Sequence, residues 1–331
     1  MYNETKKLIS EMLDKNVIPG ADYAFIKHGK IEQSATKGYS AVWPKKQKLS
    51  SNQFFDVASL TKVVGTVPMI LLLKKQGKIY LDQKVCEILP DIKNSKVTIR
   101  NLITHTSGVG GWINNRDNLN AAQLRRAIYE NISFGKGLNT VIQYNDYNYL
   151  LLGFIIEKIT HLPVQEAIQL FIFNRLNYRG LTFKPDVNQC VPTEIREGVV
   201  LHGLVHDPKA HSLGIHAASA GLFANKITLI QFVLDMLKTK NKMFNENELE
   251  EFNQNQTHND KLLRSFGWAF EAKNKNQVVL RHSGFTGTFI LFDRITKNGL
   301  IFLSNRVHPK PNMEFLDYRQ KIYSSFVKED Q

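Results

Sequence analysis

The sequence is poor in cysteine, with only Cys86 and Cys190 among its 331 residues. Two thiols are too few for the disulfide framework of a small secreted domain. Neither has a second cysteine or a histidine at the spacing of a metal site. We therefore expect two free thiols in a reducing compartment and no cysteine-based metal centre.

The sequence also lacks an apolar run long enough to cross a membrane. The longest apolar stretch, residues 63–73, is interrupted by Gly65 and Pro68 and is shorter than the ~20 residues that a membrane helix needs. Residues 1–13 have the pattern of an amphipathic helix and lack the apolar region of a signal peptide. We therefore expect no membrane span, and a cytoplasmic location unless an upstream leader has been removed.

Acidic residues are the minority among the charges. The 43 Lys and Arg against 30 Asp and Glu give a formal net charge of +13, which can indicate a nucleic-acid or anionic-surface partner. The basic residues occur as scattered pairs, such as Lys6-Lys7 and Lys74-Lys75, without the basic stripe interleaved with aromatics that nucleic-acid binding needs. The pattern favours a solvated basic surface and no nucleic-acid partner.

The hydrophobic content of 43% is sufficient for a sizeable core. Alternation typical of strands occurs near both ends of the chain, and helical periodicity dominates the middle. Strands at both ends with helices between them indicate an α/β (α+β) fold, with a sheet-containing domain of residues 1–66 and 182–331 and an inserted helical domain of residues 67–181. The expected strands are residues 21–27, 31–41, 54–57, 266–271, 277–281, 288–295 and 300–305. The expected helices are residues 1–13, 59–77 with a kink or division at Pro68, 99–104, 121–131, 147–160, 164–176, 227–238 and 313–327. Residues 186–215 are expected to form a long irregular loop.

The tetrapeptide Ser-x-x-Lys begins at four serines, so by itself it indicates nothing. Only Ser59 lies where a strand-like run meets the first turn of an apolar helix, where Lys62 would lie one turn away on the same side. The backbone N–H of Ser59 would have no intrahelical partner there and could donate to an oxyanion. The alternative is that Ser59 only caps the helix and Lys62 is solvated. The four pairs are Ser34/Lys37, Ser59/Lys62, Ser133/Lys136 and Ser325/Lys328.

Two further segments follow Ser59-Leu60-Thr61-Lys62 along the chain. Tyr144-Asn145-Asp146 precedes an apolar helical run, and His282-Ser283-Gly284 begins a Gly-rich link between two expected strands. Together the three segments resemble the S-x-x-K, Y-x-N and K-T-G motifs of serine β-lactamases and penicillin-binding proteins, in that family's order. The resemblance extends from about Ala21 to Asn305, and residues 102–108 and 214–223 are similar to segments of the class C β-lactamase-like esterases and peptidases.

The resemblance implies the β-lactamase/transpeptidase-like fold, a mostly antiparallel sheet flanked by helices with an inserted helical domain. It also implies a covalent mechanism that needs no cofactor and no metal. Ser59 would be the nucleophile, and Lys62 and Tyr144 would handle its proton. The backbone N–H groups of Ser59 and Phe285 would hold the oxyanion. Which of Lys62 and Tyr144 takes the serine proton stays open.

Two positions depart from the β-lactamase pattern. Asp146 replaces the motif's asparagine, and near Lys62 it would favour the ammonium form, which would make Tyr144 the base. His282 replaces the lysine that helps to bind the β-lactam carboxylate. Because an unperturbed histidine titrates near pH ~6.5, we expect its charge to vary over the working range. Asp146, His282, Ser283 and Gly284 are thus candidate substrate-binding residues.

Four histidines lie four or five residues apart in residues 202–216. The segment contains Pro208 and Gly214, so we expect it to be irregular, and no cysteine or glutamate stands at ligand spacing. We therefore predict no metal site. His206 and Asp207 fall in a segment that resembles one beside the active-site mouth in the family, and they are candidate pocket residues. The histidines are His202, His206, His211 and His216.

The sequence thus predicts a serine hydrolase that acts through an acyl-enzyme on small carboxylic esters or amides. β-Lactamase and D,D-carboxypeptidase activities are alternatives within the same chemistry. A catalytically idle relative that binds a ligand is the alternative of another class. The expected partner is a small-molecule ester, amide or peptide, and the sequence indicates no oligomeric state.

Overall fold

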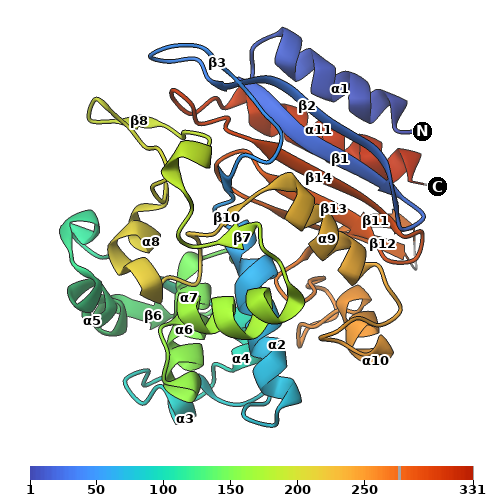
Figure 1. The fold of residues 1–331 in the computed structure, drawn as a ribbon. Coiled ribbons are helices and arrows are strands. Elements are labelled where there is room, and N and C mark those ends of the chain that lie inside the picture. Colours follow the sequence, from blue (N-terminus) through green and yellow to red (C-terminus); the bar gives the residue numbers. More distant parts are fainter. Residues whose placement is uncertain (275–276, 331) are drawn as a thin grey trace.

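The main sheet of the protein joins strands from the two ends of the chain. The computed structural model describes residues 1–274 and 277–330. Seven antiparallel strands follow the order β11-β12-β13-β14-β1-β2-β3, so the N-terminal strand β1 lies beside β14 in the interior of the sheet (Figure 1). These strands are β1 (Gly20–Lys27), β2 (Lys30–Ala41), β3 (Gln47–Lys48), β11 (Ala269–Asn274), β12 (Gln277–Ser283), β13 (Phe289–Asp293) and β14 (Asn298–Ser304).

Helices form most of the middle of the chain and cover both faces of the sheet (Figure 1). Side chains at several helix starts accept hydrogen bonds from free backbone N–H groups, as Asn145 does from Tyr147 N at 2.9 Å. The α-helices are α1 (Asn3–Asp14), α2 (Val67–Lys75), α3 (Val85–Ile88), α4 (Ile99–Ile103), α5 (Ala121–Asn131), α6 (Asp146–Thr160), α7 (Val164–Ile168), α8 (Pro208–Leu213), α9 (Lys226–Met236), α10 (Glu246–Glu250) and α11 (Glu314–Glu329). The short helical turns are η1 (Lys62–Thr66), η2 (Arg116–Asn118), η3 (Gln169–Asn174), η4 (Val187–Gln189), η5 (Gly214–His216) and η6 (Glu251–Asn253). One small sheet contains β4 (Phe55–Asp56), β10 (Phe223–Ala224) and β7 (Leu181–Thr182). Two further small sheets pair β5 (Val109–Gly111) with β6 (Ile132–Phe134) and β8 (Ile195–Arg196) with β9 (Val199–Val200).

Alternate side chains of the main sheet enter two different cores. On one face Phe25 of β1 and Phe302 of β14 pack with residues of α1 and α11. On the other face Ala24 of β1 and Ile301 of β14 join the core of the remaining helices. Successive residues of a strand point to opposite faces, so a run that is apolar throughout is buried on both sides.

The larger core continues from the sheet into the helical middle of the chain. It contains Ala24 of β1, Val64 of η1 and Ile155 of α6. This core does not stop at residue 66 or at residue 181. The division into a sheet-containing domain and an inserted helical domain stays a prediction.

The helix that follows Ser59 changes from a π-type turn to an α-helix at Val67 and is not divided at Pro68, while the predicted kink stays a prediction. The π-helical turn η1 runs directly into α2, and Pro68 lies in the first turn of α2. Proline is tolerated at that place because it needs no backbone N–H there. Turns of the π type are frequent at functional sites, and this one begins at Lys62.

Residues 186–215 are more regular than the sequence indicated. They contain α8, which Asp207 caps by accepting a hydrogen bond from Ala210 N at 2.8 Å. Pro208 occupies the first turn, where proline favours a helix. The prediction of a long irregular loop is therefore wrong for residues 208–213, because a proline in the first turn favours a helix and does not by itself indicate irregular structure.

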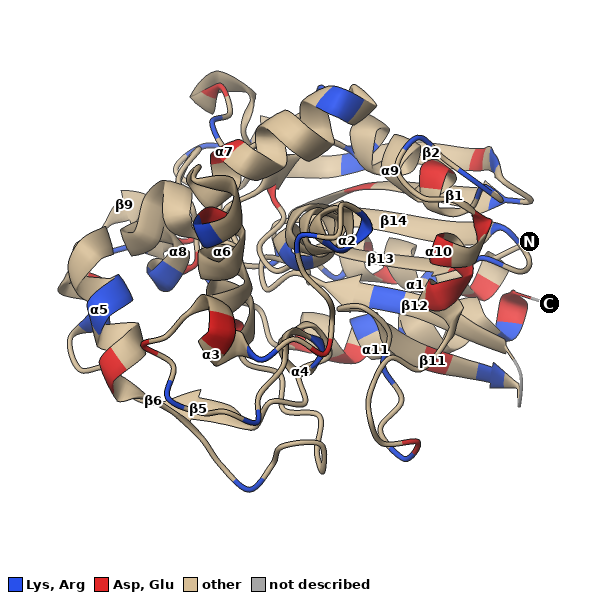
Figure 2. Cartoon of the chain, turned by 90° about the horizontal axis from the view of Figure 1, so that it is seen from below, with Lys and Arg blue, Asp and Glu red and all other residues tan. Residues whose placement is uncertain are grey.

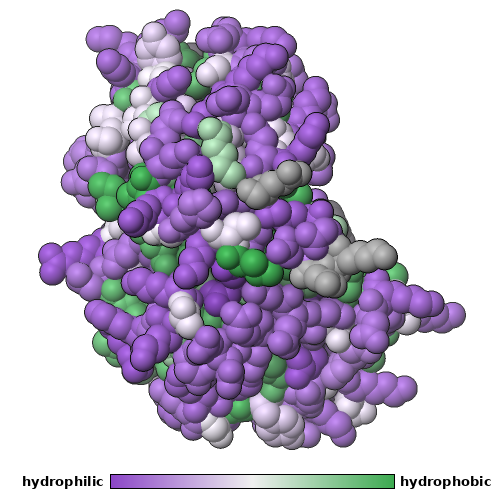
Figure 3. All heavy atoms as spheres, turned by 90° about the vertical axis from the view of Figure 1, so that its right-hand side faces the viewer, coloured by the Kyte–Doolittle hydropathy of each residue, from purple (hydrophilic) through white to green (hydrophobic). Residues whose placement is uncertain are grey.

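The surface carries charges of both signs on the sheet and the helices alike (Figure 2). On the face shown in Figure 3, hydrophobic residues form small separate patches in a largely hydrophilic surface. Within residues 1–274 and 277–330, no helix has the length and apolar character needed to cross a membrane.

Candidate active site

Ser59 lies between β4 and η1, and its side chain contacts Lys62. The preceding residue, Ala58, has a left-handed backbone with φ of 44°, a conformation that costs energy outside glycine. Lys62 Nζ donates to Ser59 Oγ over 2.8 Å, and Lys62 is fully buried. The Ser-x-x-Lys spacing therefore brings the two groups together, and the alternative of a solvated lysine is excluded.

The ammonium group of Lys62 uses all three of its hydrogens. Its acceptors are Ser59 Oγ, the carbonyl oxygen of Ser219 at 2.7 Å and Asp146 Oδ1 at 2.9 Å. Burial opposes the charge of Lys62, but the carboxylate of Asp146 and the phenol of Tyr144 together more than offset this and raise the pKa of Lys62 above its usual range. Burial likewise opposes ionisation of Asp146, but Lys62 and Lys209 hold its pKa below the usual range. Lys62 thus has no free lone pair to accept a proton.

Four charged side chains of the site form a chain of ion pairs that alternates in sign. Lys209 Nζ of α8 lies 3.0 Å from Asp146 Oδ2 and 3.2 Å from Asp207 Oδ2. The order Lys62, Asp146, Lys209, Asp207 therefore alternates in sign. The sequence analysis singled out Asp207 but missed Lys209, whose only local signal was its place two residues after a helix cap.

Tyr144 lies just before α6 and is 47% exposed. Its ring stacks on His105 with centroids 4.4 Å apart, and Lys62 Nζ lies 5.2 Å from its centroid. A second phenol near Lys62, Tyr149, is fully buried and donates to the carbonyl oxygen of Ile103 over 3.1 Å. Burial raises the pKa of Tyr149. Of these two phenols, Tyr144 is the one that lines the pocket around Ser59.

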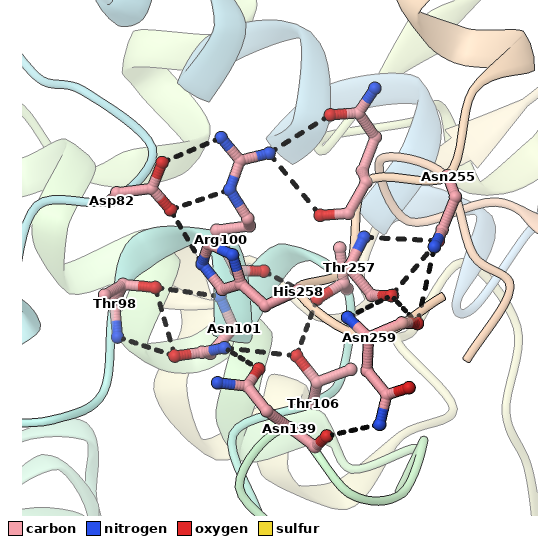
Figure 4. Close-up of polar contacts among 12 residues, drawn as sticks. Asp82, Thr98, Arg100, Asn101, Thr106, Asn139, Asn255, Thr257, His258 and Asn259 are labelled. Atoms are coloured by element: carbon pink, nitrogen blue, oxygen red, sulfur yellow. Dashed lines mark hydrogen bonds and ion pairs between the residues drawn. The ribbon is translucent and has the colours of Figure 1, made fainter. Parts of the chain in front are cut away.

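A polar network holds the segment that leads to Tyr144 (Figure 4). Asn101 Nδ2 of α4 donates to Thr106 Oγ1 over 3.2 Å and to Asn139 Oδ1 over 2.7 Å. Asn259 Nδ2 donates to the carbonyl oxygen of Asn139 over 2.9 Å. The network therefore joins α4, the segment before Tyr144 and the loop that contains Asn259.

The turn after β12 is fastened to the segment that carries Ser59. Thr286 Oγ1 donates to the carbonyl oxygen of Asp56 over 2.6 Å. Gly284 lies at the contact, where a Cβ would come within 2.3 Å of the carbonyl oxygen of Val57. Only glycine permits this approach. The third motif residue is thus required by packing, whatever else it contacts.

This approach places two backbone N–H groups at one pocket. Ser59 and Phe285 both line it, and within the described part of the chain neither N–H donates a hydrogen bond. Free N–H groups that converge on one point can stabilise the negative charge of an oxyanion. The pair of oxyanion donors that the resemblance implied stays a prediction.

His282 lies on β12 and is buried, with 4% of its surface exposed. Neither ring nitrogen has a hydrogen-bond partner among the described residues. Burial, with the charges of Lys62 and Arg264, holds the pKa of His282 well below its usual value. The expectation that its charge varies over the working range is therefore wrong. A sequence motif does not reveal burial, and burial decides this charge.

We expect His282→Asn to leave the shape of the pH profile of kcat/KM unchanged. The parent histidine is already neutral near neutral pH, because its pKa is lowered, so its removal deletes no titration there. The measurement compares an anionic and a neutral substrate from pH 5.5 to 9 in both proteins. A step near pH 6.5 in the parent that the variant lacks would show that His282 does titrate.

His206 forms part of the pocket wall. Its ring stacks on Phe285 with centroids 5.4 Å apart, and its Nε2 lies 3.1 Å from Glu194 Oε2. Asp56 accepts hydrogen bonds from the backbone N–H of His206 at 2.7 Å and of Ala58 at 2.8 Å. This buried carboxylate, missed by the sequence analysis, joins the His206 segment to the turn before Ser59.

The histidines of residues 202–216 do not converge. His202 Nε2 lies 2.8 Å from the carbonyl oxygen of Cys190, and His216 Nδ1 lies 2.7 Å from Glu157 Oε1. In the part of the chain that the structure describes, no group of three His, Cys, Asp or Glu could hold a metal ion. Cys86 and Cys190 are free thiols.

Ser59 opens into a cavity of about 840 Å³. Tyr144, Asp146, His206, Asp207 and residues 282–285 line it as well. A cavity of about 920 Å³ beside α5 contains none of these residues, so size alone does not locate the chemistry. The charged side chains that line the Ser59 cavity are Arg116, Arg196, Lys209, Arg264, Arg281, Arg306 and Arg319, with Asp146, Glu194 and Asp207.

Comparison with known proteins finds relatives along most of the chain. The family model described as Beta-lactamase matches residues 5–324. An N-acetylmuramyl-L-alanine amidase of Bacillus subtilis is 25% identical, with 92% of this chain and 82% of the relative covered. A putative D-alanyl-D-alanine carboxypeptidase of Escherichia coli is 24% identical with the same coverage.

Solved structures of low sequence identity share the fold. A class C beta-lactamase has a TM-score of 0.75 at 20% identity, with 98% of this chain and 96% of the other covered. A beta-lactamase/D-alanine carboxypeptidase from Pseudomonas syringae has a TM-score of 0.77 at 17% identity, with 99% and 98% covered. The predicted antiparallel sheet flanked by helices is therefore confirmed.

Proposed function

The chain belongs to the beta-lactamase family of serine hydrolases, and on that premise we propose that it cleaves small amides or esters bearing a carboxylate through an acyl-enzyme on Ser59. The observation that carries this proposal is the 2.8 Å contact of Lys62 Nζ with Ser59 Oγ at the cavity. A buried lysine that donates to a serine hydroxyl at a pocket wall orients that hydroxyl for attack.

Tyr144 is the base in this proposal. Lys62 donates all its hydrogens, and the carboxylate of Asp146 holds it in the ammonium form. A base must accept the Ser59 proton, which an ammonium cannot do. Tyr144 lines the same cavity and lies beside the positive charge of Lys62.

Acylation then proceeds with every proton accounted for. The ionised Tyr144 takes the proton of Ser59 Oγ while Oγ bonds to the substrate's carbonyl carbon, and the carbonyl electron pair moves onto oxygen. The N–H groups of Ser59 and Phe285 stabilise that oxyanion. The electron pair on that oxygen then re-forms the carbonyl double bond as the bond to the leaving amine or alcohol breaks. Tyr144 gives its proton to the leaving group. Water repeats the sequence and releases the acid.

The cationic wall of the cavity favours a substrate with a carboxylate. Arg306 and Arg319 form no ion pair with any Asp or Glu that the structure describes, and Arg306 is 2% exposed. Burial, reinforced by the charge of Arg319, lowers the pKa of Arg306 to about 10. An anionic ligand would relieve the repulsion between the two arginines. Hydrogen bonds between charged groups are also stronger than hydrogen bonds between neutral groups.

The names of two relatives agree with an amide substrate. One is called an N-acetylmuramyl-L-alanine amidase and the other a putative D-alanyl-D-alanine carboxypeptidase. We therefore favour amides of amino acids, with simple esters and β-lactams as alternatives of the same chemistry. Esterase activity and a cytoplasmic location stay predictions.

The test compares an acyl-D-alanyl-D-alanine with the same peptide amidated at its C-terminus, beside a neutral chromogenic ester and a chromogenic cephalosporin. We expect kcat/KM to favour the free carboxylate by about tenfold or more, the value of a charge-assisted contact. Arg319→Gln should reduce this preference, whereas Arg126→Gln, on the exposed face of α5, should not. Equal rates for both peptides would contradict the carboxylate preference, and no turnover of any substrate would favour an idle ligand-binding protein.

A further inference from the structure

Arg264 is a buried arginine without a carboxylate partner. It is 7% exposed, and its Nη2 donates to the carbonyl oxygen of Gly267 over 2.9 Å. Its Nε has no hydrogen-bond partner, and it forms no ion pair with an Asp or Glu in residues 1–274 or 277–330. A buried charge without a counter-ion destabilises a fold. Stability therefore does not explain this residue.

The guanidinium of Arg264 lies close to Tyr144. Its central carbon is 5.9 Å from the centroid of the Tyr144 ring, on which Lys62 Nζ also lies at 5.2 Å. Lys62 is neutralised by Asp146 at 2.9 Å, whereas Arg264 is not neutralised by any group described here. Arg264 thus supplies the uncompensated positive charge beside this phenol.

The remaining groups around Tyr144 do not replace that charge. His105 and His282 lie 4.4 Å and 6.1 Å away between ring centroids, and burial lowers the pKa of each well below its usual value, so both are neutral. Arg281 on β12 is paired with Glu271 of β11. The titratable and charged groups near the ring are therefore Lys62 on η1, His105 after α4, Asp146 and Tyr149 on α6, Arg264 before β11, and Arg281 and His282 on β12.

The polar network that Figure 4 shows in part connects the loop before Arg264 with the segment before Tyr144. The backbone N–H of Arg264 donates to Asn255 Oδ1 over 3.2 Å, and its carbonyl oxygen accepts from Gln256 N over 2.9 Å. The same loop reaches the segment before Tyr144 through Asn259 and Asn139. The two side chains therefore come from segments that are joined to each other, which is the rigid support that an electrostatic role requires.

We propose that Arg264 is a positioning residue whose positive charge stabilises the ionised form of Tyr144 that takes the Ser59 proton. This inference rests on the proposed function, in which Tyr144 is the base. Removing the cation makes ionisation of the phenol harder. The acid limb of the rate, along which activity rises as the base loses its proton, then moves to higher pH.

The test follows the rate at which a neutral fluorophosphonate probe labels Ser59 from pH 5 to 10. For Arg264→Gln we expect the acid limb about one pH unit higher and the rate at pH 7 about tenfold lower, with recovery to within about twofold of the parent at pH 10. Arg264→Gln/His282→Lys returns a cation to the cluster and should move the limb back. Arg294→Gln, which removes a buried arginine outside the cavity, should leave the limb in place.

A structural role or a substrate-binding role gives different results. Because Arg264 is an unpaired buried charge, its glutamine variant should melt at or above the temperature of the parent. A variant that fails to fold, or whose rate falls equally at every pH, would assign Arg264 to the fold and overturn the inference. An unmoved limb with a higher KM for carboxylate substrates would assign it to binding. If the Tyr144→Phe variant is labelled at the parent rate, the assignment of Tyr144 as the base is wrong. If that variant is not labelled, while the acid limb of the Arg264→Gln variant stays at the pH of the parent, only the role of Arg264 is wrong.

Discussion

Ser59→Ala will abolish turnover and covalent labelling, with a loss in kcat of at least about a thousandfold, as when the nucleophile of a serine hydrolase is removed. Lys62 cannot form the acyl bond in its place, because Asp146 holds it as an ammonium. The fold should persist, because the side chain of Ser59 makes its contact with Lys62 at the cavity and not in the core. Labelling with a fluorophosphonate and a thermal melt measure the two effects.

Ser133→Ala is the matched control for that variant. Ser133 begins another Ser-x-x-Lys tetrapeptide, with Lys136, but it lies on β6 outside the cavity. Its alanine variant should be labelled at the parent rate. Persistent labelling of the Ser59→Ala protein would move the nucleophile elsewhere and remove the basis of the proposed function.

Tyr144→Phe should lower kcat by about 10²–10⁴, the range for loss of a general base. The substitution keeps the ring that stacks on His105 at 4.4 Å and removes only the hydroxyl. Binding and fold should therefore be retained while proton transfer is lost. The measurement is the rate of acylation in a single turnover, which separates this step from substrate binding and product release.

Tyr147→Phe controls for the loss of a phenol in the same region. Tyr147 lies three residues further along, is 6% exposed within the larger core and does not line the cavity. We expect its phenylalanine variant to acylate at the parent rate. If Tyr144→Phe acylates as fast as this control, Lys62 must lose its proton despite the ion pair, and the assignment of the base is wrong.

Sequence reasoning located the elements whose signals are local. The amphipathic run 121–131 became α5 with the same bounds, and the alternation around His28-Gly29 became the β1–β2 hairpin. Ser59 and Lys62 meet because three residues along a helix is a fixed geometric step. In each case the physical cause lies within a few residues of the chain.

The remaining features depend on contacts between distant segments. His282 is neutral because other elements bury it, and Arg264 meets Tyr144 across 120 positions of sequence. Asp56 joins the Ser59 turn to His206, which lies on a different loop. No spacing rule links such residues, so their charge states and partners follow only once the fold is known.

The place of β1 beside β14 makes completion of the main sheet depend on strands that are synthesised long after β1. β1 lies between β2 and β14, with Ala21 opposite Ser304, so the first hairpin keeps an open edge until β14 has left the ribosome. Strand pairing over such a separation is slow and leaves aggregation-prone edges exposed. A chain stalled before β12 carries Ser59 and Lys62 without Phe285. Nascent chains of that length should therefore require chaperones and ignore serine-directed probes.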